Sequence, residues 1–124
     1  MVVDNVLEQD RLLERLQSTF KTIFVDDRRI RSSHGYRAVH AIVRIDDRWV
    51  EIQVRTQEQH LWAEWSEKLS DTKDPTIKYG GGPPELQAKL KEYSELLRGV
   101  EELQRENVKT AQKLEAMLEK GVEP

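Results

Sequence analysis

The chain has 124 residues, a length that fits one domain with a small hydrophobic core. Its 20 Lys and Arg nearly balance its 23 Asp and Glu, for a formal net charge of -3, so the overall charge gives no support to general nucleic-acid binding. The absence of cysteine excludes disulfides and thiolate metal sites, and no apolar run approaches the ~20 residues that span a bilayer. The N-terminus lacks the apolar stretch of a signal peptide, so we expect a soluble, cytoplasmic protein without a membrane partner.

The first part of the chain predicts a helix, a short strand and a basic loop. Apolar residues recur at roughly helical spacing over 4–20, with Asp4 or Asn5 as the N-cap. The next segment, KTIFV at 21–25, is typical of a short strand. The sequence DDRRIRSSHG at 26–35 predicts a basic loop that ends on a turn-permissive glycine.

The segment from residue 36 to residue 55 predicts an antiparallel hairpin. Two β-rich runs flank Asp46 and Asp47, which form a plausible two-residue turn. Because side chains alternate across a strand, one face of the hairpin is apolar and belongs to the core: Val39, Ala41, Val43, Ile45, Val50, Ile52 and Val54. With this turn, His40 lies opposite Gln53, Ile42 opposite Glu51 and Ala38 opposite Arg55. The other face therefore gathers polar side chains: Tyr36, His40, Glu51, Gln53 and Arg55.

Two more helices are expected after the hairpin. Residues 56–71 predict a helix capped by Thr56, and loop follows over 74–84. From Pro84 to about Lys120 only one glycine interrupts a helical pattern, which would reach ~50 Å at 1.5 Å per residue. Its apolar positions follow a 4-3-4-3 spacing at first and weaken later: Leu86, Leu90, Tyr93, Leu97 and Val100, then Gln104 and Asn107, then Ala111, Leu114 and Leu118. Either the first half packs on the domain as an ordinary helix, or this helix is a seam for a second copy or another protein.

The polar face of the hairpin has two interpretations. It can be a solvated surface, as in many antiparallel sheets. Two details favour a nucleotide site instead: Trp49 lies on the same face, and an arginine cluster precedes the hairpin, at positions Arg28, Arg29, Arg31 and Arg37. An aromatic ring for stacking, a carboxylate for magnesium or proton abstraction, and arginines for phosphate are what phosphoryl transfer on a nucleotide requires.

Three segments carry a resemblance to a known family. The sequences HGYRAVH, VEIQVRT and QHLWAEWSEKL resemble the second half of the RelA/SpoT-type synthetase domain, the (p)ppGpp synthetases, over roughly residues 1–82. Members of this family transfer pyrophosphate from ATP to the 3'-hydroxyl of GDP or GTP with Mg²⁺. The resemblance implies an α+β fold with a mixed sheet, flanking helices and a long C-terminal helix, and it divides the chain into a partial synthetase domain over 1–82 and a helix over 83–124.

The resemblance also implies roles for individual residues. Tyr36 resembles the residue that stacks on the acceptor guanine, with His40, Arg37 and Arg55 as further acceptor contacts. Glu51 resembles the carboxylate that binds magnesium and activates the 3'-hydroxyl, with Gln53 supporting it as a second catalytic residue. Independently of the resemblance, the basic loop has two interpretations: Arg29 and Arg31 contact phosphate, or they solvate the loop beside Asp26 and Asp27.

Two departures from the family pattern modify these expectations. The family's ATP-binding half, with a basic segment and a metal-binding Asp in a DxxGxR setting, does not precede Val2, so we expect the chain alone to be catalytically incomplete. In the acceptor loop, Ser32 and His34 replace the Lys and Asn of the motif PKxNGY. This loop is closer to the toxic small alarmone synthetases, some of which pyrophosphorylate the tRNA 3' end. A GDP/GTP pyrophosphokinase domain, a tRNA-modifying toxin and a non-catalytic assembly module therefore remain as hypotheses.

Overall fold

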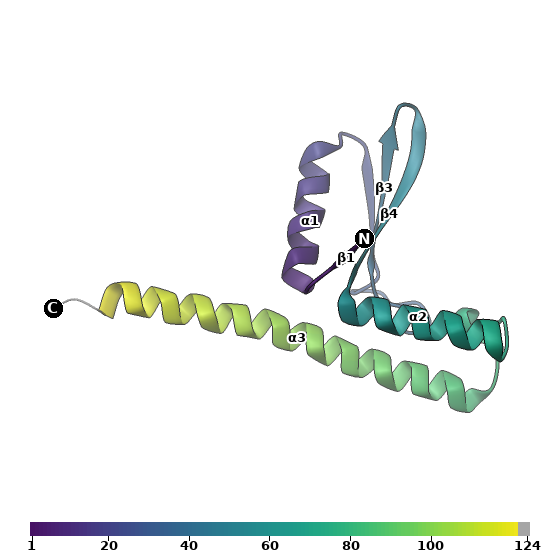
Figure 1. Ribbon diagram of the computed structural model, residues 1–124. Helices are drawn as coiled ribbons and strands as arrows, with labels where there is room; N and C mark the ends of the chain where they lie inside the picture. The colour runs from purple at the N-terminus through teal and green to yellow at the C-terminus, as the bar shows by residue number, and fades with distance from the viewer. Residues whose placement is uncertain (122–124) are drawn as a thin grey trace.

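A mixed four-stranded sheet and three α-helices build the chain, and the structure, a computed structural model, describes residues 1–121. The elements in chain order are β1 (Val2–Val3), α1 (Val6–Thr19), β2 (Ile23–Asp27), β3 (Val39–Ile45), β4 (Arg48–Thr56), α2 (Gln57–Thr72), the 3-10 helix η1 (Ile77–Tyr79) and α3 (Pro84–Gly121). The α+β class and the long C-terminal helix are confirmed (Figure 1). The turn η1 lies within the predicted loop.

The strands follow the order β1-β4-β3-β2, and only the β1–β4 pair is parallel. The predicted hairpin register is confirmed, since His40 pairs with Gln53 and Ile42 with Glu51. Asp46 and Asp47 both adopt positive φ, at 48° and 62°, as a tight two-residue turn between twisted strands requires. This register fixes which side chains share a face of the sheet.

Side-chain caps set the start of the first two α-helices. Asn5 accepts hydrogen bonds from the backbone N–H groups of Leu7 and Glu8, so of the two predicted caps it is Asn5 that acts. Thr56 accepts from the backbone N–H of Gln59, and the Gln59 side chain accepts from the backbone N–H of Thr56. This capping box turns the end of β4 directly into α2.

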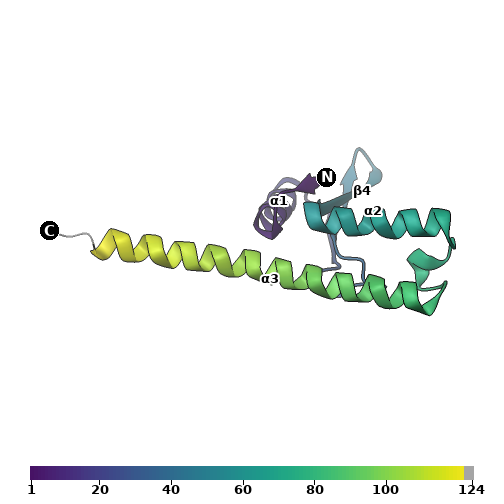
Figure 2. The same cartoon turned by 60° about the horizontal axis from the view of Figure 1, so that its bottom comes forward.

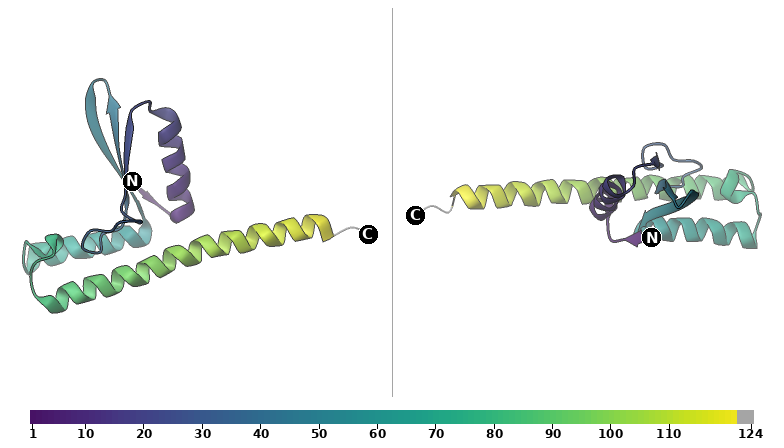
Figure 3. Two further views of the ribbon diagram at one scale, coloured as in Figure 1. Left: turned by 180° about the vertical axis from the view of Figure 1, so that it is seen from behind. Right: turned by 90° about the horizontal axis from the view of Figure 1, so that it is seen from above.

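One face of the sheet is covered by α1, which runs alongside the strands (Figures 1 and 3). The hairpin residues nearest the helices are completely buried on this face: Val39, Ala41, Val43 and Val54. Ile45 and Val50, also predicted as core, are each 39% exposed. They lie near the tip of the hairpin, which projects away from the helices in Figure 1, so the apolar face is buried only toward its base.

A second apolar cluster lies between α2 and α3, which run side by side (Figure 2). It contains Trp62, Ala63, Ile77, Leu90 and Leu97. The indole N–H of Trp62 donates to the carbonyl of Leu90 at 3.0 Å, so this tryptophan both packs and ties the two helices together.

The 38 residues of α3 would span about 57 Å, and its C-terminal half extends beyond the rest of the molecule (Figures 1 to 3). The predicted apolar stripe is divided: Leu90 and Leu97 face the core, whereas Tyr93 and Val100 are 44% and 37% exposed. Every described residue from 109 onward is exposed. None of the described helices is apolar enough over a sufficient length to cross a bilayer.

Candidate functional site

Five polar side chains on the uncovered face of the sheet form a closed ring of contacts. Arg55 Nε donates to Tyr36 Oη at 3.1 Å, and Tyr36 Oη lies 2.8 Å from His40 Nε2. His40 Nδ1 lies 3.3 Å from Glu51 Oε1, which accepts from Gln53 Nε2 at 2.7 Å. Gln53 Oε1 in turn accepts from Arg55 Nη2 at 3.0 Å, which closes the ring. These are the five residues that strand alternation predicts on this face.

The imidazole of His40 lies between a hydroxyl group and a carboxylate in this ring. Burial lowers the pKa of His40 below its ordinary value of 6.5, and the nearby Glu51 carboxylate offsets this only in part. His40 Nε2 faces the Tyr36 hydroxyl group, and His40 Nδ1 faces the Glu51 carboxylate. The contacts thus run from the arginine through the tyrosine and the histidine to the carboxylate.

Two arginines lie near the Tyr36 ring. The guanidinium carbons of Arg28 and Arg55 lie 5.6 and 5.3 Å from its centroid, and the ring meets His40 edge-on at 5.5 Å. Arg28 pairs with Asp26 at 3.0 Å, and Asp26 is the strand partner of His40. The sequence analysis places Arg28 in the basic cluster before the hairpin but gives Asp26 no site role, although Asp26 lies on the same face of β2 as Phe24.

Glu51 stands at the exposed side of the ring. Its side chain is 47% exposed, and the contacts described above involve its Oε1. Among residues 1–121, no group of three or more acidic, histidine or cysteine side chains is placed to hold a metal ion. Magnesium in phosphoryl-transfer sites takes one or two carboxylates together with substrate phosphate oxygens, so a single carboxylate fits a site shared with substrate.

Two of the predicted arginines lie away from the ring. Arg37 is buried and forms a bidentate pair with Glu101 of α3 at 2.7 and 2.8 Å, and Gln59 also donates to this carboxylate. Arg29 forms ion pairs with Asp27 at 2.7 Å and with Asp10 at 2.6 Å. Their positive charges are therefore already neutralised within the chain.

Arg31 remains exposed in the loop. At the start of α2, His60 lies 3.4 Å from Arg55 through Nδ1 and 2.9 Å from Glu64 through Nε2. This histidine therefore borders the ring on the helix side.

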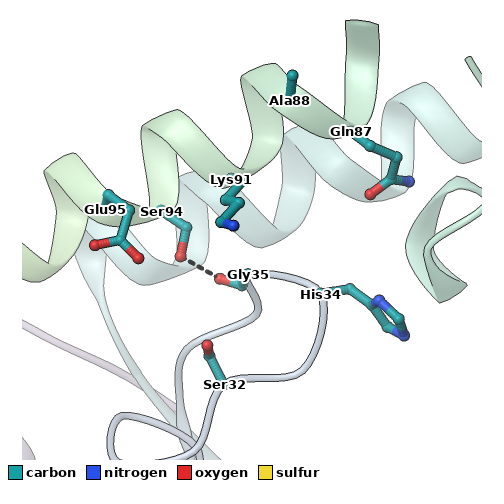
Figure 4. Close-up of a pocket in the computed structure, with 8 residues that line it drawn as sticks. All are labelled: Ser32, His34, Gly35, Gln87, Ala88, Lys91, Ser94 and Glu95. Atoms are coloured by element: carbon teal, nitrogen blue, oxygen red, sulfur yellow. Dashed lines mark hydrogen bonds between the residues drawn. The ribbon is translucent and has the colours of Figure 1, made fainter. Parts of the chain in front are cut away.

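A cavity of about 400 Å³ lies between the loop before Tyr36 and the first turns of α3 (Figure 4). Ser32 and His34, the two positions that depart from the family loop, both line it, and Lys91 enters it from α3. Lys91 makes no ion pair within the part of the chain that the structure describes. Ser94 Oγ donates to the Gly35 carbonyl at 2.6 Å and holds the loop against the helix.

Known proteins are similar to this chain in sequence or in fold. Residues 1–71 match the region found in RelA/SpoT proteins. The chain is 39% identical over 83 residues to two uncharacterized mycobacterial proteins, Rv1366 of Mycobacterium tuberculosis and Mb1401 of Mycobacterium bovis. The match covers 65% of this chain and 30% of each relative. The crystal structure of small alarmone synthetase 1 from Bacillus subtilis superposes with a TM-score of 0.66 and 23% identity, over 90% of this chain and 61% of that one.

The match over more than half of the chain defines a RelA/SpoT-type synthetase domain, and the chain belongs to this family. The superposition on the alarmone synthetase shows the shared fold. The chain spans about 30% of the length of the curated relatives that it matches.

Proposed function

We propose that the polar face binds the acceptor substrate of a pyrophosphokinase, which transfers pyrophosphate from ATP to the 3'-hydroxyl of GDP or GTP. The observation that supports it most is the closed ring of Tyr36, His40, Glu51, Gln53 and Arg55 on an uncovered sheet face. A purely solvated surface has no need for a buried histidine held between a tyrosine and a carboxylate. In this proposal Tyr36 stacks on the guanine base, and Arg28 and Arg55 fix the orientation of its ring.

In this proposal Glu51 takes the proton from the acceptor 3'-hydroxyl as that oxygen attacks the β-phosphorus of ATP. A new O–P bond forms, the bond between the β-phosphorus and the bridging oxygen breaks, and AMP leaves. Gln53 and His40 orient the carboxylate, because each contacts its Oε1. Glu51 would also hold Mg²⁺ together with substrate phosphates, and the ion would offset the phosphate charge.

The donor side of such a site needs further cations and a second carboxylate. Arg29 and Arg37 cannot supply the cations without leaving their carboxylate partners. We therefore expect these 124 residues alone to bind an acceptor but to transfer no pyrophosphate. Incubation with labelled ATP and GDP or GTP should give no labelled ppGpp or pppGpp, and clear product formation would contradict this part of the proposal.

Acceptor binding tests the proposal without the donor side. Calorimetric titration of the chain should detect GDP or GTP, and the corresponding adenosine nucleotides serve as controls. Deacylated tRNA belongs in the same series, because Ser32 and His34 replace the loop residues typical of guanine-nucleotide acceptors. Binding of tRNA with no binding of GDP or GTP would favour the toxin hypothesis, and no binding of any of them would overturn the acceptor role.

The loop cavity bears on acceptor choice. The ammonium group of Lys91 enters the cavity beside the position where the loop has Ser32 in place of a lysine. We expect it to contact acceptor phosphate, together with Arg31. Lys91→Ala should then weaken GDP or tRNA binding more than the nearby Lys89→Ala, since Lys89 does not line the cavity.

A second candidate function is assembly. The apolar side chains on the outer part of α3 favour it, because more than half of the surface of each is exposed: Leu114, Met117 and Leu118.

A further inference from the structure

A stripe of exposed residues follows α3 outside the core at heptad spacing. We call it the α3 stripe, and it consists of Leu96, Val100, Leu103, Asn107, Thr110, Leu114 and Met117. Its aliphatic members are between 37% and 64% exposed. The spacing alternates between four and three residues throughout, which is the a/d pattern of a helix that packs on another helix. It differs from the stripe expected from the sequence, because Leu90 and Leu97 are already used by the core.

We propose that the α3 stripe pairs with the α3 stripe of a second copy of this chain in an antiparallel helix pair. In an antiparallel pair each a position faces a d position of the other helix. One register sets Val100 against Met117 of the second copy, and Leu103 against Leu114 of the second copy. The same register sets Asn107 against Thr110 of the second copy, so that aliphatic residues meet aliphatic residues and polar residues meet polar residues.

Shifting this register by one heptad in either direction removes the match. In one direction Leu103 meets Asn107 of the second copy, and in the other Asn107 meets Met117 of the second copy. A polar side chain buried against an aliphatic one without a hydrogen-bond partner is unfavourable. A polar residue at an a position is a known determinant of register for this reason.

Flanking charges favour the same register and direction. In the antiparallel register Glu106 lies beside Lys113 of the second copy, and the two-fold symmetry creates this pair twice. One shifted register sets Glu106 beside Glu106 of the second copy, which is unfavourable. The other sets Lys113 beside Lys113 but also Glu106 beside Lys120 of the second copy, so it is the contact of Asn107 with Met117 that disfavours this register. A parallel pair would place Glu106 beside Ala111 and Lys113 beside Leu118, with no opposite charge in either case. All of these flanking residues are exposed in the single chain.

The chain offers a direct test because it contains no cysteine. Leu103→Cys and Leu114→Cys variants, one with a longer tag, are mixed under mild oxidation and the disulfide-linked species are separated by mass. Antiparallel pairing predicts a mixed dimer of the two variants, whereas a parallel pair predicts that each variant links to itself. In the antiparallel register two Leu103 positions are about 16 Å apart along the helix, too far for a disulfide. Self-linked products in place of the mixed one would overturn the proposal.

A charge exchange provides an independent test that introduces no cysteine. Glu106→Lys should lower the dimer fraction measured by light scattering, and adding Lys113→Glu should restore it. Both residues are exposed in the single chain, so folding should be unaffected. Glu102→Lys with Lys109→Glu on another face of α3 is the matched control and should change nothing. A chain that stays monomeric at high concentration, or that pairs only with another protein, would contradict self-pairing. Neither experiment depends on the catalytic proposal, since neither involves the sheet face.

Discussion

The five residues of the contact ring act as one unit, and Tyr36 is the member whose two roles can be separated. Its hydroxyl group links Arg55 to His40, whereas its ring is the surface proposed to stack on the acceptor base. Tyr36→Phe keeps the ring and should retain most of the affinity for guanosine nucleotide measured by calorimetry. Tyr36→Ala should weaken it about tenfold or more, since stacking of a base on an aromatic side chain contributes about 1–3 kcal/mol.

Similar affinities in the two variants would argue against stacking. Tyr79→Ala is a suitable control, because Tyr79 is an exposed tyrosine in η1 that contacts Lys78 and lies outside the ring.

His40 gives the site a pH dependence whose sign follows from its environment. Because burial lowers its pKa in the folded state, the unfolded chain binds a proton first as the pH falls. The free energy of unfolding should therefore decrease below pH 6.5 and continue to fall through the lowered pKa. His40→Gln should flatten this part of a urea-denaturation series. His34→Gln, at an exposed position, should leave it in place, and an unchanged slope in His40→Gln would contradict the assignment.

The carboxylates near α1 titrate in a different range. Partial burial raises the pKa of Asp10, but hydrogen bonds from Arg105 and Arg29 outweigh it and hold the value below 3.8. Burial raises the pKa of Asp27 as well, but hydrogen bonds from Arg29 outweigh it and lower the value. Stability from these groups is lost only as the pH falls below 3.8, so it does not overlap the histidine transition.

At the level of elements, α3 holds the loop on both sides of Tyr36. Ser94 binds the carbonyl of Gly35, and two turns further along the helix Glu101 binds the guanidinium of Arg37. The residues before and after the tyrosine are thus tied to one helix. The position of the proposed stacking residue depends on α3 although the two are far apart in the sequence.

Removing this buried ion pair should be costly. Glu101→Gln leaves the Arg37 guanidinium buried without its counter-charge, and such a loss costs about 3 kcal/mol or more. Urea denaturation should show this decrease, while Glu102→Gln at the neighbouring exposed position should stay within about 0.5 kcal/mol of the parent. Replacing both partners, Arg37→Met with Glu101→Leu, should recover much of the stability. A Glu101→Gln effect as small as that of the control would contradict a structural role for this pair.

Local patterns predicted most elements and the ring, because alternation in a strand and capping in a helix depend on neighbouring residues. The hairpin register followed from a two-residue turn, and it placed Glu51 and His40 on one face. The buried ion pair of Arg37 could not be predicted in this way, because its partner Glu101 lies 64 positions away on α3. The ion pair of Arg29 with Asp10 could not be predicted for a similar reason, since Asp10 lies on α1. Basic residues in a loop show charge, but only packing shows whether that charge is already neutralised.

At the scale of the whole molecule, α3 has one part that packs on the domain and an outer part that is exposed. The part up to about Val108 completes the core, holds the loop before Tyr36 and contacts α1, whereas every described residue from 109 onward is exposed. Val108 is the last described residue of α3 that is partly buried. Folding and self-pairing should therefore be separable by shortening the helix.

A chain that ends at Lys109 tests this separation. The removed residues up to Gly121 are all exposed, so we expect the free energy of unfolding to change by no more than about 1 kcal/mol, from helix fraying and propensity alone. The shortened chain should bind guanosine nucleotide with the affinity of the full chain, because the ring, the loop cavity and the Arg37–Glu101 pair are intact. It should also be monomeric at every concentration, since it lacks Leu114 and Met117, the aliphatic partners of Leu103 and Val100 in the second copy. Loss of stability or of nucleotide binding on truncation would show that the outer half supports the domain directly.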